Sequence, residues 1–312
     1  MSKYTALVAS LCMTMMASTG YTSTMKPPAD NAFPFNVLID NGDVVKDTSQ
    51  APYSSLVKVN FNGYLCTGTL INYNEVLTAG HCAEDKNSKK IEPTAYTITS
   101  SDGKTSWHVK KVETSYIQNP ESDFAVLTID NTDKNVPTVA LASEKVTQQF
   151  LLTDYPPLLA VGYGIDLARP DKNYNADLQQ GVITPTSQFN AEKTVSNGVA
   201  WFLSKGLVLP LKYDPKGVFA TCSKQPTDHG DSGGPVFYKN PADNEIYLVG
   251  TTSRGLTVKN PGERGEFLSY DHCIDHSNVD QEGQKLSVFT DLTYNSLNYQ
   301  KLKNIETQMN KD

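Results

Sequence analysis

Short apolar runs alternating with polar residues dominate the middle of the chain. In residues 56–61 (Leu-Val-Lys-Val-Asn-Phe) the apolar and polar side chains alternate with a period near two, as in a half-buried strand. Many short strands divided by turn residues predict an all-β protein, built as a barrel or a sandwich. Similar runs, separated by Gly, Pro, Asn and Asp, recur at 70–71, 76–77, 124–129, 139–141, 158–161, 182–183, 201–203, 236–238, 247–249 and 288–292.

Three segments depart from this strand pattern. Residues 21–38 are rich in Pro, Asn and Thr, which predicts a linker or a short propeptide. Residues 255–285 are polar and contain several turn residues, which predicts a large surface insertion. Residues 294–309 show helical periodicity, with Leu297 and Leu302 as the apolar positions, and predict a C-terminal helix.

The N-terminus has the pattern of a secretory signal peptide. Lys3 is the only charged residue before Lys26, and a weakly apolar stretch follows at 6–16. Small residues at Ser18 and Gly20 have the spacing that signal peptidases recognise. We therefore expect residues 1–20 to be removed from an extracellular or periplasmic protein that has no membrane association afterwards.

Composition and charge exclude several classes of protein. The 312 residues are 38% hydrophobic and 20% charged, enough apolar content for a packed core rather than a disordered chain. At about 150 residues per domain the length suggests roughly two folding units. The net charge of −7, without a basic stripe, argues against a nucleic-acid partner. After residue 20, no apolar run approaches the roughly 20 residues that span a bilayer.

The cysteines indicate disulfides rather than a metal site. Four remain after removal of the predicted signal peptide, and an even number in an exported protein predicts two disulfides. The run 271–276 (Asp-His-Cys-Ile-Asp-His) contains metal-ligand types. Its cysteine is expected to be oxidised and the segment is polar, so we expect a surface loop and neither a metal nor a cofactor. The four cysteines are Cys66, Cys82, Cys222 and Cys273.

Three segments carry residues suited to nucleophilic catalysis: 77–82 with His81, 122–127 with Asp123, and 230–235 with Ser232. A serine hydroxyl is a poor nucleophile until a base takes its proton, and histidine titrates in the right range. The imidazole needs a buried carboxylate on its other nitrogen, and Asp123 opens an apolar run that would bury it.

Other residues of the same types fit these roles less well. His108 lies in an alternating strand and is expected to be structural. Asp133 and Asp154 lack the apolar run that would bury a carboxylate. Gly230 allows a turn in which its N–H and that of Ser232 converge on one point, where they would stabilise a developing oxyanion.

The motifs TAGHC around His81, SDFAVL around Asp123 and GDSGGP around Ser232 resemble the triad motifs of the chymotrypsin/trypsin family of serine endopeptidases. The order His, Asp, Ser is that of this family and differs from subtilisins and α/β-hydrolases. The resemblance extends from about residue 55 to 303. Further segments similar to the family lie at 66–71, 161–164, 249–255 and 288–291.

The resemblance implies two packed six-stranded antiparallel β-barrels, at about 55–150 and 151–293, in a peptidase domain over 39–312. It implies an endopeptidase that hydrolyses polypeptides through an acyl-enzyme, with the oxyanion held by the N–H groups of Gly230 and Ser232. It also implies a secreted protein, for which we expect a bacterial source, a monomeric state, and a protein inhibitor or a host protein as a further partner.

The family pattern also implies pairings. Cys66 would pair with Cys82, and Cys222 with Cys273, although the second match is imperfect because Cys273 lies inside the insertion. Asp231 would pair with a new N-terminal amine at Ile39, released by cleavage after Leu38. No Lys or Arg precedes that bond, so another protease would make the cut, or an internal Arg or Lys would hold Asp231 instead.

Specificity is left open by the sequence. In trypsins an aspartate six positions before the nucleophile binds Lys or Arg, and here that position is Pro226. A Thr, a His and an Arg around one pocket would favour an acidic side chain. Preferences for a small or apolar residue, or for a basic one through Asp228, stay open. The residues expected to bind substrate are Pro226, Thr227, His229, Ser253, Arg254 and Gly255.

Two alternatives stay open, and only the first belongs to another class of protein. The first is a non-catalytic secreted binding protein on the same fold, with 255–285 as its interaction surface. The second is a protease restricted to one host or self protein.

Overall fold

The structure is a computed structural model of the full chain. It describes residues 38–85, 87, 89–116, 122–152, 156–164, 177–183, 217–223, 227, 229–255, 257–258, 266–267, 285–294 and 296–309. These residues belong to the second of the two units into which the chain divides, residues 33–312. The predicted signal peptide and residues 21–37 of the predicted linker lie outside the described residues. Within the described residues, no helix combines the length and the apolar character that a membrane crossing requires.

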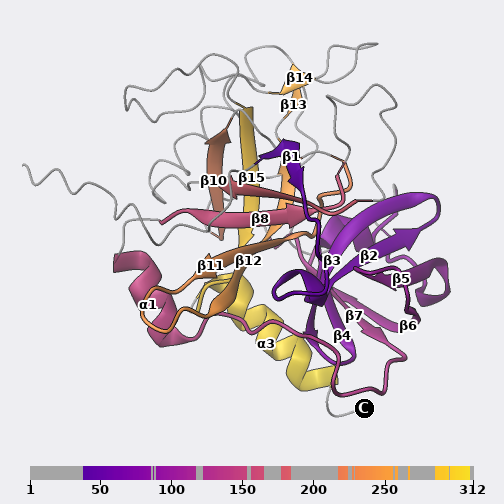
Figure 1. The fold of residues 1–312 in the computed structure, drawn as a ribbon. Coiled ribbons are helices and arrows are strands. Elements are labelled where there is room, and N and C mark those ends of the chain that lie inside the picture. The colour runs from indigo at the N-terminus through magenta and orange to yellow at the C-terminus, as the bar shows by residue number, and fades with distance from the viewer. Residues whose placement is uncertain are drawn as a thin grey trace, which may run out of the picture. The chain divides into compact units, whose positions relative to one another are not determined.

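The first half of the described chain is a closed six-stranded antiparallel barrel, as predicted (Figure 1). Its strands follow one another around the barrel in the order β2-β3-β4-β7-β6-β5. Their bounds are β2 Leu56–Phe61, β3 Tyr64–Asn72, β4 Glu75–Thr78, β5 Tyr96–Ser100, β6 Ser106–Thr114 and β7 Ala125–Ile129.

Alternating side chains explain why these residues form a barrel. In β2, the side chains of Val57 and Val59 are fully buried, whereas the side chain of Asn60 is exposed. The turn from β2 to β3 is Asn62–Gly63, with φ angles of 48° and 80°. An Asn-Gly pair with positive φ at both residues is the typical two-residue hairpin loop, because its twist matches that of the strands.

The second half is a seven-stranded sheet in the order β1-β9-β8-β11-β12-β15-β10. It differs in detail from the predicted second six-stranded barrel, because β1 precedes the first barrel in sequence and pairs with β9 at the sheet edge. All strand pairs in it are antiparallel. The bounds are β1 Leu38–Val44, β8 Leu158–Gly162, β9 Gln179–Ile183, β10 Val218–Ser223, β11 Pro235–Lys239, β12 Ile246–Gly255 and β15 Lys285–Asp291.

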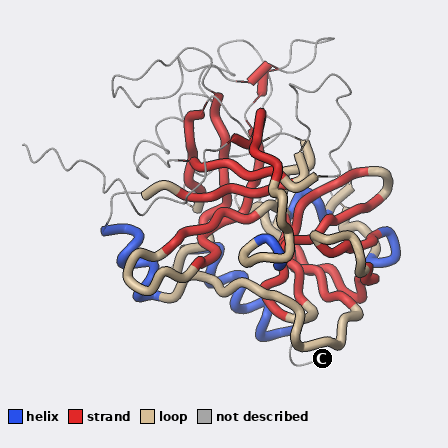
Figure 2. Tube along the Cα trace, viewed as in Figure 1, coloured by secondary structure: helices blue, strands red, loops and turns tan. Residues whose placement is uncertain are grey.

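Helices are few among the described residues (Figure 2). The predicted C-terminal helix is present as α3, Leu297–Met309, with Leu302 buried and Leu297 half exposed. A second helix, α1 (Glu144–Leu152), was not predicted. Short 3-10 helices are η1 Tyr53–Ser55, η2 Gly80–Ala83 and η3 Pro93–Ala95.

Two predicted segments differ from the structure or are only partly described. The run 139–141, predicted as a strand, forms only an isolated bridge between Leu141 and Leu248. Within the predicted insertion, two short strands, β13 Thr257–Val258 and β14 Glu266–Phe267, pair as a small antiparallel ribbon. Most of the rest of that segment lies outside the described residues, as does the predicted strand at 201–203.

One apolar cluster joins the barrel to the sheet. Leu77 and Phe124 from the barrel side pack in the same cluster as Val161 and Phe237 from the sheet, and Leu302 of α3 belongs to it as well. All five side chains are at most 1% exposed. The ends of β4 and β7 are therefore packed against the sheet that carries the 230–235 turn.

Candidate active site

His81 and Asp123 meet because β4 and β7 are neighbours in the barrel. Thr78 at the end of β4 pairs with Ala125 at the start of β7, so the residues just beyond them lie close together. The backbone N–H of His81 donates to Asp123 Oδ1 over 2.9 Å, and the ring Nδ1 lies 2.9 Å from Asp123 Oδ2. One carboxylate thus holds both the backbone and the ring of the same histidine.

Asp123 is buried, with an exposed side-chain fraction of 3% against 33% for His81. The Ser253 hydroxyl donates to Asp123 Oδ2 over 2.5 Å, and the Thr290 hydroxyl donates to the Asp123 carbonyl over 3.0 Å. A carboxylate on Nδ1 favours the tautomer with the proton on that nitrogen. The outer nitrogen, Nε2, is then left to accept a proton.

The turn that contains Ser232 is connected to His81 through the Cys66–Cys82 disulfide. The N–H of Thr67 donates to the Ser232 carbonyl over 2.9 Å. Thr67 follows Cys66, and Cys66 is bonded to Cys82, the residue after His81. The candidate nucleophile and the candidate base are therefore linked through one hydrogen bond and one disulfide.

Close packing at Gly233 adds to this link. Gly233 has a φ of +78°, and a Cβ there would lie 2.2 Å from Thr78 Oγ1 and 2.5 Å from the Ala79 nitrogen. Neither the conformation nor the space accepts a side chain. This glycine lets the residue after Ser232 lie directly against the segment that leads into His81.

The turn before Ser232 is shaped by Asp231 and by the 162–164 segment. Gly230 has a φ of +102°, and its carbonyl accepts a hydrogen bond from the Thr67 hydroxyl over 2.8 Å. Asp231 is 1% exposed, and its Oδ1 accepts the Gly164 N–H over 2.8 Å. A Cβ on Gly162 or Gly164 would come within 2.4 Å of that carboxylate, so both glycines are needed for its burial.

The trypsin family profile matches residues 39–278. The chain belongs to the trypsin family. It is also similar to the clotting factor G beta subunit of Tachypleus tridentatus, with 22% identity over 245 residues, which cover 74% of this chain and 76% of that protein. The family assignment agrees with the barrel, with the second sheet and with the three motifs that the structure brings together.

One predicted disulfide of the trypsin-family domain is confirmed. Cys66 and Cys82 are bonded, with their Cα atoms 6.5 Å apart. Their sulfur atoms lie within 4.8 Å of a ring nitrogen of His81, but oxidised cysteines supply no thiolate for a metal ion. Cys222 lies on β10, and Cys273 lies outside the described residues, so the Cys222–Cys273 pairing stays a prediction.

The residues expected to bind substrate are only partly described. Thr227 is buried, and its N–H donates to the Ser287 hydroxyl over 3.0 Å. His229 is exposed. The hydroxyl of Ser253 donates to Asp123, and its predicted part in substrate binding stays a prediction. Pro226 lies outside the described residues, and Arg254 and Gly255 are described only as backbone of β12.

The activation residues are described in the uncleaved chain. Ile39 lies in β1, where Leu38 before it pairs with Gln180 of β9. Asp231 lies in the turn before Ser232, with Gly164 as its backbone donor. The predicted pairing of Asp231 with an Ile39 amine requires a cut that this chain has not undergone, and it stays a prediction.

Several residues that organise the site were not predicted. Thr67 bonds to both Gly230 and Tyr163, and Thr290 supports Asp123. The Lys301 ammonium of α3 donates to the hydroxyl of Ser122, the residue before Asp123, over 2.6 Å. Their residue types and spacing carry no signal, since each acts on a segment far away in the sequence.

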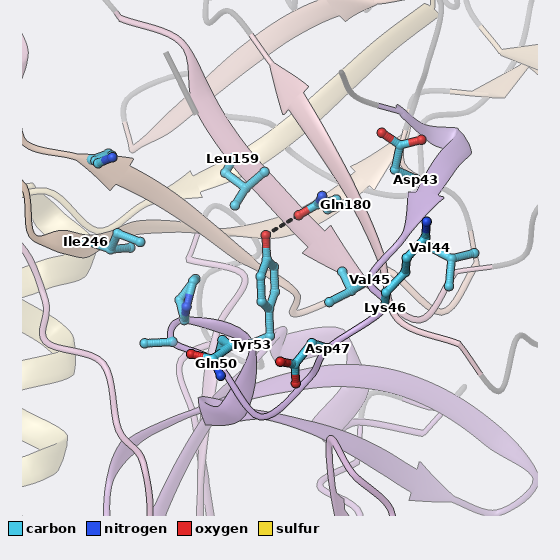
Figure 3. Close-up of a pocket in the computed structure, with 13 residues that line it drawn as sticks. Asp43, Val44, Val45, Lys46, Asp47, Gln50, Tyr53, Leu159, Gln180 and Ile246 are labelled. Atoms are coloured by element: carbon cyan, nitrogen blue, oxygen red, sulfur yellow. Dashed lines mark hydrogen bonds between the residues drawn. The ribbon is translucent and has the colours of Figure 1, made fainter. Parts of the chain in front are cut away.

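A pocket near β1 is separate from the triad (Figure 3). Tyr53 points across it and its hydroxyl donates to the Gln180 side chain. Neither His81, Asp123 nor Ser232 lines this pocket. It is therefore not the site at which the trypsin-family triad would act.

Proposed function

We propose that this chain is a secreted serine endopeptidase that hydrolyses peptide bonds through Ser232, His81 and Asp123. The observation that carries the proposal is the double contact of buried Asp123 with the backbone and ring of His81, beside the Ser232 turn. A binding protein on this fold would have no need for the buried carboxylate of Asp123, which costs free energy to desolvate.

The proposed mechanism follows from these contacts. The Ser232 hydroxyl attacks the substrate carbonyl while His81 Nε2 takes its proton, and Asp123 stabilises the resulting imidazolium. The N–H groups of Gly230 and Ser232 hold the oxyanion. His81 then gives its proton to the leaving amine, and a water molecule hydrolyses the acyl-enzyme by the same steps.

Export and activation form part of the proposal. The disulfide at Cys66 and Cys82 suits an oxidising compartment, which agrees with the signal-peptide pattern of residues 1–20. Cleavage after Leu38 would free the Ile39 amine to pair with Asp231. Mass spectrometry of the exported protein checks both steps, and a mature form that begins elsewhere than Ile39 would contradict the activation step.

We propose a specificity that is not trypsin-like, because proline stands at position 226 in place of an aspartate. Acidic residues, or small and apolar ones, are the expected preferences. Cleavage profiling on a peptide library decides between them. Strict cleavage after Lys or Arg would contradict both and would favour a role for Asp228.

Labelling of the mature protein with a fluorophosphonate tests the function. We expect covalent labelling and hydrolysis of casein by the wild-type protein, and neither by Ser232→Ala. Ser49→Ala, at an exposed serine, is the matched control and should behave as wild type. Equal hydrolysis by wild type and Ser232→Ala would reject the proposed mechanism. Labelling without casein hydrolysis would favour a protease restricted to one protein.

A further inference from the structure

A second buried carboxyl group lies beside the His81–Asp123 pair. Glu84 is 8% exposed, and its Oε1 is buried without a hydrogen-bond partner among the described residues. Asp123, by contrast, accepts hydrogen bonds from His81 and Ser253. A buried, unsatisfied carboxylate is costly, so the burial of Glu84 requires an explanation.

The backbone holds Glu84 close to His81. Glu84 is the residue directly after η2 and follows His81 by three positions, one turn of a 3-10 helix, and its carboxyl group interacts with the charges of His81 and Asp123. Two backbone contacts fix the position of this segment. Glu84 forms an antiparallel β-bridge with Lys90, and the Ile91 N–H donates to the Ala83 carbonyl over 2.9 Å. The Cys66–Cys82 disulfide ties the same helix to β3.

Of the three described groups that act on the Glu84 carboxyl, two are carboxylates and one is an imidazole. Burial, followed by the charges of Asp123 and Asp85, raises the pKa of Glu84 to about 7, and the positive form of His81 opposes this increase. Asp85 is exposed and accepts the N–H groups of Asn87 and Lys89.

The cations on the neighbouring elements are engaged with another carboxylate. On β6, Glu113 lies 3.9 Å from the Lys90 ammonium and 3.7 Å from that of Lys111. Among the described groups that influence the Glu84 carboxyl, positively charged His81 is therefore the one that stabilises the ionised form of Glu84.

We propose that Glu84 is a positioning residue that acts on the His81–Asp123 pair through the charge of its buried carboxyl group. When ionised, Glu84 stabilises the imidazolium of His81, and so raises the proton affinity of His81. The charges of Glu84 and His81 act on one another, so the ionisations of the two groups are coupled. This inference rests on the proposed function only for its effect on catalysis.

The test is Glu84→Gln, which keeps the size and polarity of the side chain and removes its charge. Because the His81 side chain is 33% exposed and water screens the interaction, a unit charge a few ångström away changes its proton affinity by roughly three- to tenfold. The midpoint of the His81 titration, followed by NMR, should therefore fall by about 0.5 to 1 pH unit. The acid limb of kcat/KM should move to lower pH by the same amount and become a single ionisation.

Glu92→Gln is the matched control, because it makes the same chemical change at an exposed glutamate in the same connection. It should leave both the His81 titration and the acid limb unchanged. An unchanged His81 midpoint in Glu84→Gln would overturn the inference, as would an equal shift in Glu92→Gln.

The NMR titration separates this inference from the proposed function, since it can be run in the Ser232→Ala protein. Loss of the proposed protease activity would leave the titration result standing. If Glu84→Gln does not fold, ¹³C NMR of the wild-type glutamate carboxyls decides the question. A Glu84 carboxyl that titrates near pH 7 supports the inference, and one that titrates near its ordinary value of 4.5 contradicts it.

Discussion

The barrel contains two His–Asp pairs with the same pattern of contacts and very different surroundings. His108 donates its backbone N–H to Asp130 Oδ1 over 3.0 Å, and its ring Nδ1 lies 3.3 Å from Asp130 Oδ2. His81 and Asp123 make the same two contacts. The side chains of the first pair are 86% and 37% exposed, against 33% and 3% for the second.

The comparison shows that the same contact pattern occurs both in water and shielded from it, so burial is what distinguishes the two pairs. At the His108 pair, water screens the charges and competes for the imidazole, so the pair is worth little. At the His81 pair, burial strengthens the interaction, and Ser253 adds a further donor to the carboxylate. Through Gly233, the Ser232 turn packs against Thr78 and Ala79, which lead into His81.

The largest expected effect comes from removing the buried carboxylate charge. Asp123→Asn should lower kcat/KM by about 10⁴-fold, because the amide favours the wrong tautomer of His81. Asp130→Asn makes the same change at the exposed pair and should alter kcat/KM by less than about twofold. Steady-state kinetics of both variants measure the difference. Similar losses in the two would mean that burial does not distinguish the pairs.

The next effect concerns the packing of the nucleophile turn. Gly233→Ala should lower kcat/KM by at least about 100-fold, since the added Cβ must displace Thr78 or Ala79 and so misplaces Ser232. Gly63→Ala is the control, because Gly63 has a similar φ of +80° but no atom within 4 Å of the added Cβ. Because only backbone strain is added, Gly63→Ala should lower the free energy of unfolding by about 1–2 kcal/mol and leave kcat/KM unchanged.

Loss of the disulfide should act on stability. The bond closes a loop with a sequence separation of 16, for which the chain-entropy model gives about 3 kcal/mol. Cys66→Ala/Cys82→Ala should lower the free energy of unfolding by this amount in denaturant titrations. The His81 pair should become more mobile in NMR and the His108 pair should not. Equal changes at both would contradict the role assigned to the bond.

The smallest effect is expected from the third partner of Asp123. Ser253→Ala removes the 2.5 Å hydrogen bond to Oδ2 and should lower kcat/KM by about tenfold, equivalent to about 1.4 kcal/mol. Ser100→Ala removes a 2.7 Å bond to the exposed Asp102 carboxylate and should leave kinetics unchanged. If Ser253→Ala has the kcat/KM of the wild type, the contribution of Asp123 to kcat/KM comes entirely from its contacts with His81.

Particular elements show how far sequence reasoning reached. The strands of the barrel follow from alternation, and the Asn62–Gly63 turn marks its first hairpin. The helix α1 was missed because it is only nine residues long and its buried apolar residues, Val146 and Phe150, form a narrow stripe against the sheet. Glu84 was missed because its residue type is ordinarily exposed, and only packing buries it.

The sequence alone determined which residues are candidates for the reaction and the periodicity of the strands, since these depend on side-chain chemistry and on neighbours a few positions away. Tertiary structure decided which histidine–aspartate pair is shielded from water, because burial is set by segments distant along the chain. The Ser253 hydroxyl reaches Asp123 from 130 positions away, and the Thr67 hydroxyl reaches Gly230 from 163. Such contacts exist only once the barrel and the sheet have packed together.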